Sequence, residues 1–286
     1  MIAQRTIKDT VVIEGIGLQT GNKVSLTMRS SPANSGINFI RTDLPNKPLL
    51  NIQSMDFEAS AQTAERRTML GFGPLQIQTT EHLLAAISGL LIDNIVIEID
   101  NVELPGLDGS AKGFADFIRK AGIVEQAAPK RFVAIEHPIW CKSHDALLVI
   151  LPDEEFRISY TLSYPVLGAQ FFTMAVSEIS FESEIAPART FCSEAEALEL
   201  LRRGLGKGAN YGNTLVMSPG GPVNNTLRFP DELARHKVLD LIGDLCLFGS
   251  AIKGHVVAVK SGHKLNMEMV KKLKETYKWE SSHTIS

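Results

Sequence analysis

The chain has 286 residues, of which 44% are hydrophobic and 21% are charged, and its formal net charge at pH 7 is −3. This composition excludes disordered and fibrous proteins, and the length predicts about two domains. Because basic and acidic residues nearly balance, no overall positive field favours binding to nucleic acid.

Membrane and secreted protein classes also lack support in the sequence. The longest apolar run, residues 83–92, has about half of the roughly 20 residues that a membrane helix needs. The first residues lack the apolar stretch of a secretory signal. The three cysteines, Cys141, Cys192 and Cys246, are too dispersed for a disulfide framework or a cysteine-based zinc site. We therefore expect a cytoplasmic protein without a transmembrane segment.

The chain contains two copies of one pattern. Residues 12–14 (VIE) open a β-rich stretch, and residues 134–136 (AIE) open another. Thr68 and Thr190 follow these glutamates at the same spacing. Each copy continues with a histidine in a predicted helix, then a β-branched strand, then a closing helix. In the first copy these are His82, residues 95–99 and residues 109–121. In the second copy they are His236, residues 256–259 and residues 265–276. The pattern predicts an internal duplication.

The duplication divides the chain into two predicted domains. They span residues 1–126 and 127–286, and they meet in the turn-prone segment 125–130. The lengths also differ between the copies, because the second has about 32 extra residues between its threonine and its histidine. We therefore predict an insert near residues 192–222 in the second domain.

The insert begins with a helix signal. Ser193 and Glu196 form a capping-box pattern, which predicts a short helix directly after them. The sequence leaves two interpretations open: the insert is a surface excursion, or it is a wall beside an active site that holds something apolar.

Three residues from the two copies form a candidate metal site. His236 and Asp240 lie about one helical turn apart, on one face of a predicted helix. Catalytic zinc commonly has three protein ligands plus water, and His82, the equivalent histidine of the first copy, is the candidate third ligand. Asp244 lies about 12 Å along the helix axis from His236, which is too far for the same ion. Zinc and iron(II) both accept such ligands, so the pattern leaves the metal open.

Further ionisable residues accompany this candidate site. Glu81 stands at the start of the first-copy helix and can act as general base on an attacking water. His263 follows a predicted strand in a loop and, near a carboxylate such as Asp244, can hold a proton as general acid. The hydroxyl of Thr190 can stabilise an oxyanion, although its repeat partner Thr68 also allows a purely architectural role. Together these groups fit metal-assisted hydrolysis of an acyl group.

Four motifs in order resemble the UDP-3-O-acyl-N-acetylglucosamine deacetylase family, the zinc amidases of lipid A biosynthesis: residues 80–86 (TEHLLAA), 188–191 (ARTF), 235–244 (RHKVLDLIGD) and 261–266 (SGHKLN). The resemblance covers nearly the whole chain. It implies a Zn²⁺ site and a set of catalytic and substrate-binding residues: His82, His236 and Asp240 as zinc ligands, Glu81 as general base, His263 as general acid supported by Asp244, Thr190 at the oxyanion site, and Phe191 and Lys237 on the nucleotide-sugar part of the substrate.

The resemblance also implies the fold and the reaction. The expected fold is α+β, with two related domains that each have a β-sheet, helices packed at the inter-domain interface, and an insert that forms a passage for an acyl chain. The expected reaction converts UDP-3-O-acyl-N-acetylglucosamine to UDP-3-O-acyl-glucosamine and acetate. We expect a monomer whose partner is this acylated UDP-sugar. Two alternatives are a zinc amidohydrolase for another acylated sugar and a non-enzymatic RNA-binding α+β module.

Overall fold

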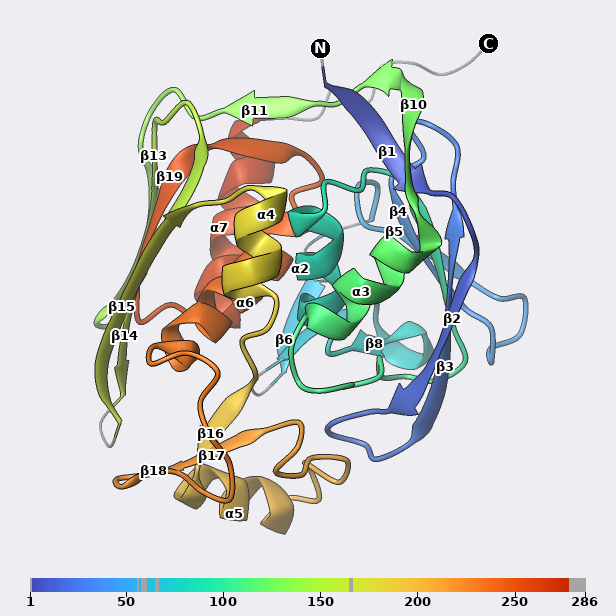
Figure 1. Ribbon diagram of the computed structural model, residues 1–286. Helices are drawn as coiled ribbons and strands as arrows, with labels where there is room; N and C mark the ends of the chain where they lie inside the picture. The colour runs from blue at the N-terminus through green and yellow to red at the C-terminus, as the bar shows by residue number, and fades with distance from the viewer. Residues whose placement is uncertain (1, 56, 58–60, 65–66, 165–166, 278–286) are drawn as a thin grey trace.

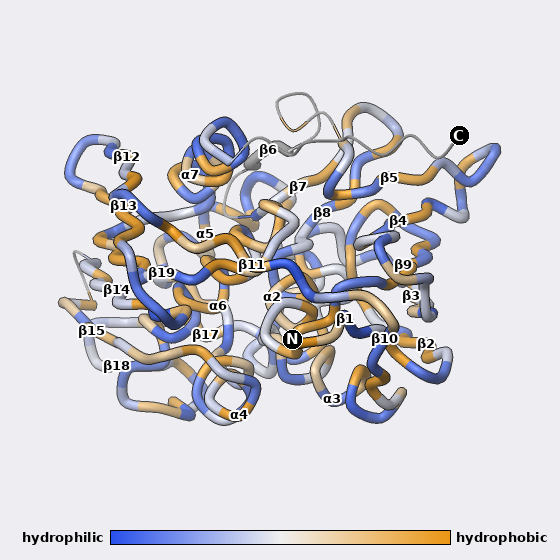
Figure 2. Tube along the Cα trace, turned by 90° about the horizontal axis from the view of Figure 1, so that it is seen from above, coloured by the Kyte–Doolittle hydropathy of each residue, from blue (hydrophilic) through white to orange (hydrophobic). Residues whose placement is uncertain are grey.

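Two β-sheets enclose a central layer of helices in the computed structural model (Figure 1). The structure describes residues 2–55, 57, 61–64, 67–164 and 167–277. In the view of Figure 2, the two sheets lie on opposite sides of the molecule and α2 and α6 lie between them. This arrangement confirms the predicted α+β class and the packing of helices between the two related halves.

The first sheet has the strand order β2 (Val11–Ile16), β3 (Lys23–Ser30), β9 (Ile95–Ile99), β4 (Ile37–Arg41) and β5 (Leu49–Asn51). Strand β9 is antiparallel to β3 and parallel to β4. Side chains alternate along these strands, so that Val24, Leu26 and Met28 of β3 are buried while their neighbours are not. The buried face packs toward the central helices.

The second sheet repeats this topology with β12 (Ile139–Ser143), β13 (Ala146–Leu151), β19 (Ala251–Val259), β14 (Phe156–Tyr164) and β15 (Gly168–Ala175). Strand β19 is antiparallel to β13 and parallel to β14, as β9 is to its neighbours. An added strand, β11 (Phe132–Ala134), pairs with β19. The same strand order in both sheets supports the duplication.

One predicted equivalence between the copies is wrong. Residues 12–14 lie in β2, whose position in the sheet corresponds to β12 and not to residues 134–136. The similarity between the VIE and AIE tripeptides is a coincidence. Equivalent strands are those that occupy the same position in the hydrogen-bonded order of the two sheets. The duplication is therefore better anchored on whole-sheet topology than on these tripeptides.

Helices α2 (Glu81–Gly89) and α6 (Glu232–Cys246) pack against each other at the centre. A Cβ atom on Gly243 would lie 2.0 Å from the backbone oxygen of Glu81, so only glycine allows this close approach. Gly89, the matching glycine of the first copy, packs instead against the Phe181 ring. The closing helices are α3 (Lys112–Ala121), which contacts β2, and α7 (His263–Thr276), which contacts β12 and β13.

The segment expected as a turn between the domains is a strand. Strand β10 (Ile123–Pro129) pairs antiparallel with β1 (Ala3–Ile7). The side chain of Gln126 also donates a hydrogen bond to the backbone oxygen of Ser31. Pairing with the chain's first strand therefore overrides the local turn propensity. The boundary between residues 126 and 127 stays a prediction, and it falls inside β10.

The insert forms a separate layer at one end of the molecule (Figure 1). It comprises β16 (Phe191–Ser193), α5 (Glu194–Arg202), β17 (Leu215–Ser218) and β18 (Gly221–Pro222). The predicted capping box is confirmed, because Ser193 and Glu196 exchange hydrogen bonds at the start of α5. The backbone N–H groups of Lys207 and Gly208 donate to the carbonyls of Gln19 and Leu18. The insert therefore packs on the first half of the chain.

The remaining described elements are short. They are β6 (Ala61–Ala64), β7 (Arg67–Leu70) and β8 (Ile77–Gln78), which form one small sheet, and the helical segments η1 (Gly73–Leu75), α4 (Glu178–Ser180) and η2 (Phe181–Ile185). Within the described part of the chain, no helix is both long enough and apolar enough to span a membrane.

Candidate metal centre and active site

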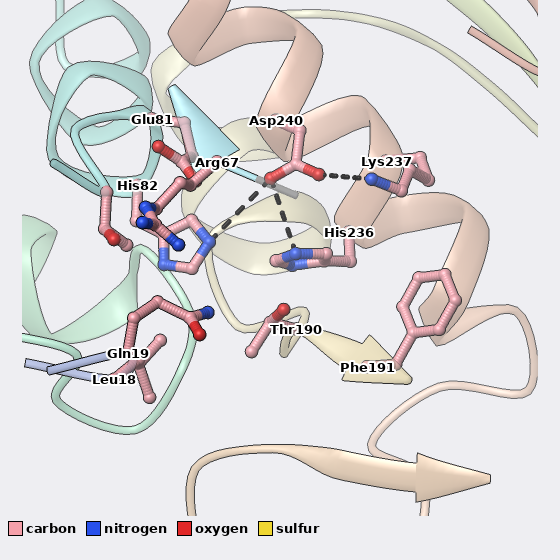
Figure 3. Close-up of a pocket in the computed structure, with 11 residues that line it drawn as sticks. Leu18, Gln19, Arg67, Glu81, His82, Thr190, Phe191, His236, Lys237 and Asp240 are labelled. Carbon is pink, nitrogen blue, oxygen red and sulfur yellow. Dashed lines mark hydrogen bonds and ion pairs between the residues drawn. The ribbon is translucent and has the colours of Figure 1, made fainter. Parts of the chain in front are cut away.

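The two central helices bring three potential metal ligands together. His236 and Asp240 lie one turn apart on α6, and His82 is the second residue of α2. One ligand atom from each residue lies within 4.8 Å of the other two. Figure 3 shows the two imidazole rings and the carboxylate converging on one point. The structure thus brings together the three residues that the sequence pattern predicted.

The cluster has the chemistry of a metal site. Asp240 Oδ1 lies 3.7 Å from His82 Nε2 and 3.4 Å from His236 Nε2. It is buried and has no hydrogen-bond partner among the described residues. Atoms that bind a tetrahedral zinc ion at about 2.0–2.2 Å lie roughly 3.4 Å from one another. The three residues therefore fit a metal ion, which would satisfy the otherwise unpaired oxygen.

Neighbouring groups orient the candidate ligands. The Nδ1–H of His236 donates to the backbone oxygen of Ala188 at 3.1 Å, which leaves Nε2 free to face Asp240. Lys237 Nζ donates to Asp240 Oδ2 at 2.6 Å, which leaves Oδ1 for the centre of the cluster.

The protonation states also suit metal binding. Burial lowers the pKa of His82 and lowers that of His236 to about 3, so both rings are neutral at pH 7. Burial alone would raise the pKa of Asp240, but the positive charges of Lys237 and of the protonated His263 hold it well below its usual range. Two neutral imidazoles and one carboxylate form the donor set that a divalent metal ion requires.

Glu81 precedes His82 at the start of α2 and lines the same pocket. Its Oε2 accepts a hydrogen bond from the backbone N–H of Thr68 at 3.1 Å. Burial raises the pKa of Glu81 to about 8, against the lowering effect of His263. A carboxylate whose pKa lies near neutrality can accept a proton during turnover.

His263 and Asp244 form a buried pair on the other side of the cluster. His263 Nδ1 donates to Asp244 Oδ2 at 2.8 Å, and Nε2 lies 3.8 Å from Asp240 Oδ2. Burial disfavours the charged ring, but the charge of Asp244 and this hydrogen bond raise the pKa of His263 to about 9. His263 lies in the first turn of α7 and not in a loop, because the helix begins directly after Gly262.

The remaining predicted residues lie at the pocket wall, Thr190 and Phe191 where the insert begins and Lys237 on α6. Thr190, Phe191 and Lys237 line the pocket, and the Phe191 and His236 rings meet edge to face at 6.1 Å between centroids. Lys237 Nζ lies 6.0 Å from the centre of the Phe191 ring. Thr190 is held between the halves, since its backbone N–H donates to the carbonyl of Gly109.

The wall of the pocket that comes from the first half of the chain was not predicted from the sequence. Leu18, Gln19, Arg67 and Thr79 also line it. Among the described residues, Nε and Nη1 of Arg67 are buried without a hydrogen-bond partner. The repeat of Arg-Thr at 67–68 and 189–190 was the one available signal for Arg67, and it pointed only to duplication.

The buried carboxylate of Glu103 holds this first-half wall of the pocket in place. Glu103 is 1% exposed and accepts hydrogen bonds from the backbone N–H groups of Gln19 and Thr20 and from the Thr79 hydroxyl. Thr79 has φ 58°, a left-handed conformation that costs a β-branched residue on the order of 1–3 kcal/mol. Its bond to Glu103 stabilises the turn that leads β8 into the helix carrying Glu81.

Arg189, which directly precedes Thr190, stabilises the loop that carries it. Its guanidinium forms a bidentate pair with Glu232, at 2.9 and 3.1 Å, and Glu232 is 0% exposed. We expect Arg189→Ala to lower the free energy of unfolding by about 3–5 kcal/mol, because it leaves a buried carboxylate unpaired. Urea denaturation measures this loss. The matched control is Lys112→Ala, which breaks an exposed pair with Asp116 and should cost at most about 1 kcal/mol; equal losses would contradict the structural role.

Comparisons with known proteins match nearly the whole chain. The family model described as UDP-3-O-acyl N-acetylglycosamine deacetylase matches residues 4–275. Several curated relatives have the name UDP-3-O-acyl-N-acetylglucosamine deacetylase. The protein from Anaeromyxobacter dehalogenans is 39% identical over 274 residues, which cover 94% of this chain and 87% of the relative. The protein from Trichormus variabilis is 38% identical, with 94% and 98% covered, and that from Colwellia psychrerythraea is 39% identical, with 98% and 93% covered.

Proposed function

The chain belongs to the UDP-3-O-acyl N-acetylglycosamine deacetylase family, and we propose that it hydrolyses the N-acetyl group of UDP-3-O-acyl-N-acetylglucosamine in lipid A biosynthesis. The products are UDP-3-O-acyl-glucosamine and acetate. The observation that carries this proposal is the buried cluster of His82, His236 and Asp240, with the candidate acid and base beside it.

We propose that these three residues bind zinc; iron(II) accepts the same donor set. When bound, the ion supplies Lewis-acid polarisation of the acetyl carbonyl and makes water more acidic. The unpaired Asp240 Oδ1 between two Nε2 atoms supports this assignment.

The protein's own side chains supply the proton transfers. Glu81 accepts a proton as water attacks the acetyl carbon, and the Thr190 hydroxyl donates a hydrogen bond to the oxygen that gains charge. His263 donates the Nε2 proton to the sugar nitrogen as the carbon–nitrogen bond breaks. This assignment is supported by the pairing of His263 Nδ1 with Asp244, which leaves Nε2 toward the cluster.

We propose that the nucleotide-sugar and acyl parts of the substrate extend from the metal site toward the insert. We propose that Phe191 and Lys237 contact the nucleotide sugar and that the insert contacts the acyl chain. All proposed ligands and catalytic groups come from one chain, which supports a functional monomer. The three cysteines are free, which agrees with a reducing, cytoplasmic location.

The insert's role predicts a dependence on acyl-chain length. Leu198 and Leu201 on α5 are 57% and 60% exposed and lie three residues apart, on one face of the helix. Replacing both by glutamine should lower kcat/KM for a long-acyl substrate by about 5- to 30-fold, as expected for partial burial of two leucines. For a short-acyl substrate, kcat/KM should fall less than about twofold.

The matched control is Leu49→Gln, a substitution at a 56% exposed leucine of the first sheet. This substitution should leave kcat/KM unchanged for both the long-acyl and the short-acyl substrate. If the double variant on α5 lowers kcat/KM equally for the long-acyl and the short-acyl substrate, the insert does not bind the acyl chain.

The reaction itself is tested with a substrate panel. We expect acetate release from UDP-3-O-acyl-N-acetylglucosamine and much slower release from UDP-N-acetylglucosamine, which lacks the acyl chain. Preferential turnover of a different acylated N-acetyl sugar would favour the alternative of an amidohydrolase with another substrate.

A further inference from the structure

Thr68 lies at the junction of the proposed base and acid. It is the second residue of β7, in the first half of the chain, and it is 0% exposed. Its backbone N–H donates to Glu81 Oε2 at 3.1 Å. Its hydroxyl donates to Asp244 Oδ1 at 2.6 Å, across the interface to α6. One buried residue therefore contacts both the Glu81 carboxylate and the carboxylate that supports His263.

The hydroxyl of Thr68 completes a fully buried network around Asp244. Asp244 Oδ2 accepts from His263 Nδ1 and from Asn266 Nδ2, each at 2.8 Å. Because the Thr68 hydroxyl occupies the other oxygen, both Asp244 oxygens are held and the carboxylate cannot rotate without losing a bond. Thr68 Oγ1 also lies 3.1 Å from His263 Nδ1. The orientation of the His263 ring thus depends on a residue from the other half of the chain.

We propose that Thr68 is a positioning residue for the deacetylation reaction, which aligns the His263–Asp244 pair with Glu81 across the interface between the two halves. The inference rests on the acid and base roles proposed above. It also explains the repeat: Thr190 lines the pocket, whereas its partner Thr68 lies behind it and acts through Asp244. The duplicated threonine has therefore diverged into a pocket residue and a supporting residue.

The competing explanation is purely structural. A buried hydroxyl that bonds across an interface also stabilises the protein, and its loss could lower activity by loosening the packing. The two explanations differ in their effect on a variant that already lacks His263. If Thr68 acts by positioning His263, its substitution should have little further effect on kcat once His263 is absent. If Thr68 is only structural, its substitution should still lower kcat in that variant.

The test compares Thr68→Val, Thr68→Ser and a double variant. Thr68→Val keeps the shape and the backbone N–H to Glu81, and removes only the hydroxyl. We expect kcat to fall about 10- to 100-fold, the range for groups that orient catalytic ligands, with KM within about twofold and unchanged metal content. Thr68→Ser should restore kcat to within about fivefold of the parent. In a His263→Ala background, Thr68→Val should lower kcat less than about twofold further.

The matched control is Thr6→Val, because Thr6 is 4% exposed and its hydroxyl accepts a hydrogen bond from the backbone of Ser31, away from the pocket. Thermal unfolding measures the stability of each variant, and Thr68→Ala replaces Thr68→Val if the latter does not fold. The inference is overturned if Thr68→Val lowers kcat no more than Thr6→Val, or if its effect is undiminished in the His263→Ala background. If His263→Ala alone retains near-normal kcat, the proposed acid role fails instead.

Discussion

Asp240→Ala is expected to abolish stable metal binding and to lower kcat/KM by at least about 10³-fold. Asp240 provides the one carboxylate of the cluster, and its Oδ1 lies between both Nε2 atoms. Without it only two imidazoles remain, which is fewer than the three protein ligands of catalytic zinc sites. Loss of Lewis-acid stabilisation worth several kcal/mol accounts for the size of the effect. His82→Ala and His236→Ala should behave in the same way.

Metal analysis of the purified variants, together with acetate release, measures this result. The matched control is His255→Ala, since His255 lies on β19 and bonds Ser159 outside the pocket. This variant should keep about one metal ion per chain. Full metal retention in both Asp240→Ala and His82→Ala would place the metal elsewhere.

Glu81→Gln and His263→Gln are expected to keep the metal ion and yet lower kcat by about 10²- to 10⁴-fold, the usual contribution of a general base or acid. Glutamine at position 81 can still accept the hydrogen bond from the Thr68 backbone, so the substitution removes the basic oxygen while preserving the shape. Glutamine at position 263 removes the proton that the ring shares with Asp244.

The control for this pair is metal content measured on the same samples, which separates loss of proton transfer from loss of the ion. Steady-state kinetics should show the change in kcat and little change in KM. Near-normal kcat in either variant would reassign the corresponding role to another group.

The metal cluster was predictable because its determinants are short-range or repeated. The spacing of His236 and Asp240 follows from helix geometry alone, and the duplication supplied His82. The closing helix near 109–121 and the strand at 95–99 were also predictable, since their hydrophobic periodicity matches the structure.

Other features depend on contacts that no local pattern encodes. Strand β10 exists because β1 pairs with it, although the residues between 125 and 130 favour a turn. Glu103 bonds Gln19 from more than 80 residues away, and Thr68 bonds Asp244 from the other half of the chain. A buried polar residue is informative only once its partners are known, so these supporting residues were not predicted.

The two related halves explain why the site lies where it does. Each half contributes one central helix, and Gly243 lets α6 approach the start of α2 closely enough for ligands from both helices to meet. The insert belongs to the second half and yet contacts the Leu18–Gln19 backbone of the first. The pocket is therefore assembled from both copies together, and neither half contains all of its proposed groups.

That the cluster of His82, His236 and Asp240 holds the catalytic metal is tested most directly by chelation followed by metal add-back. Acetate release from UDP-3-O-acyl-N-acetylglucosamine should fall to a few per cent or less in the metal-free protein. It should return in proportion to added zinc or iron(II), and reach its maximum at about one ion per chain. Acetate release that is insensitive to removal of the metal would contradict the proposed mechanism.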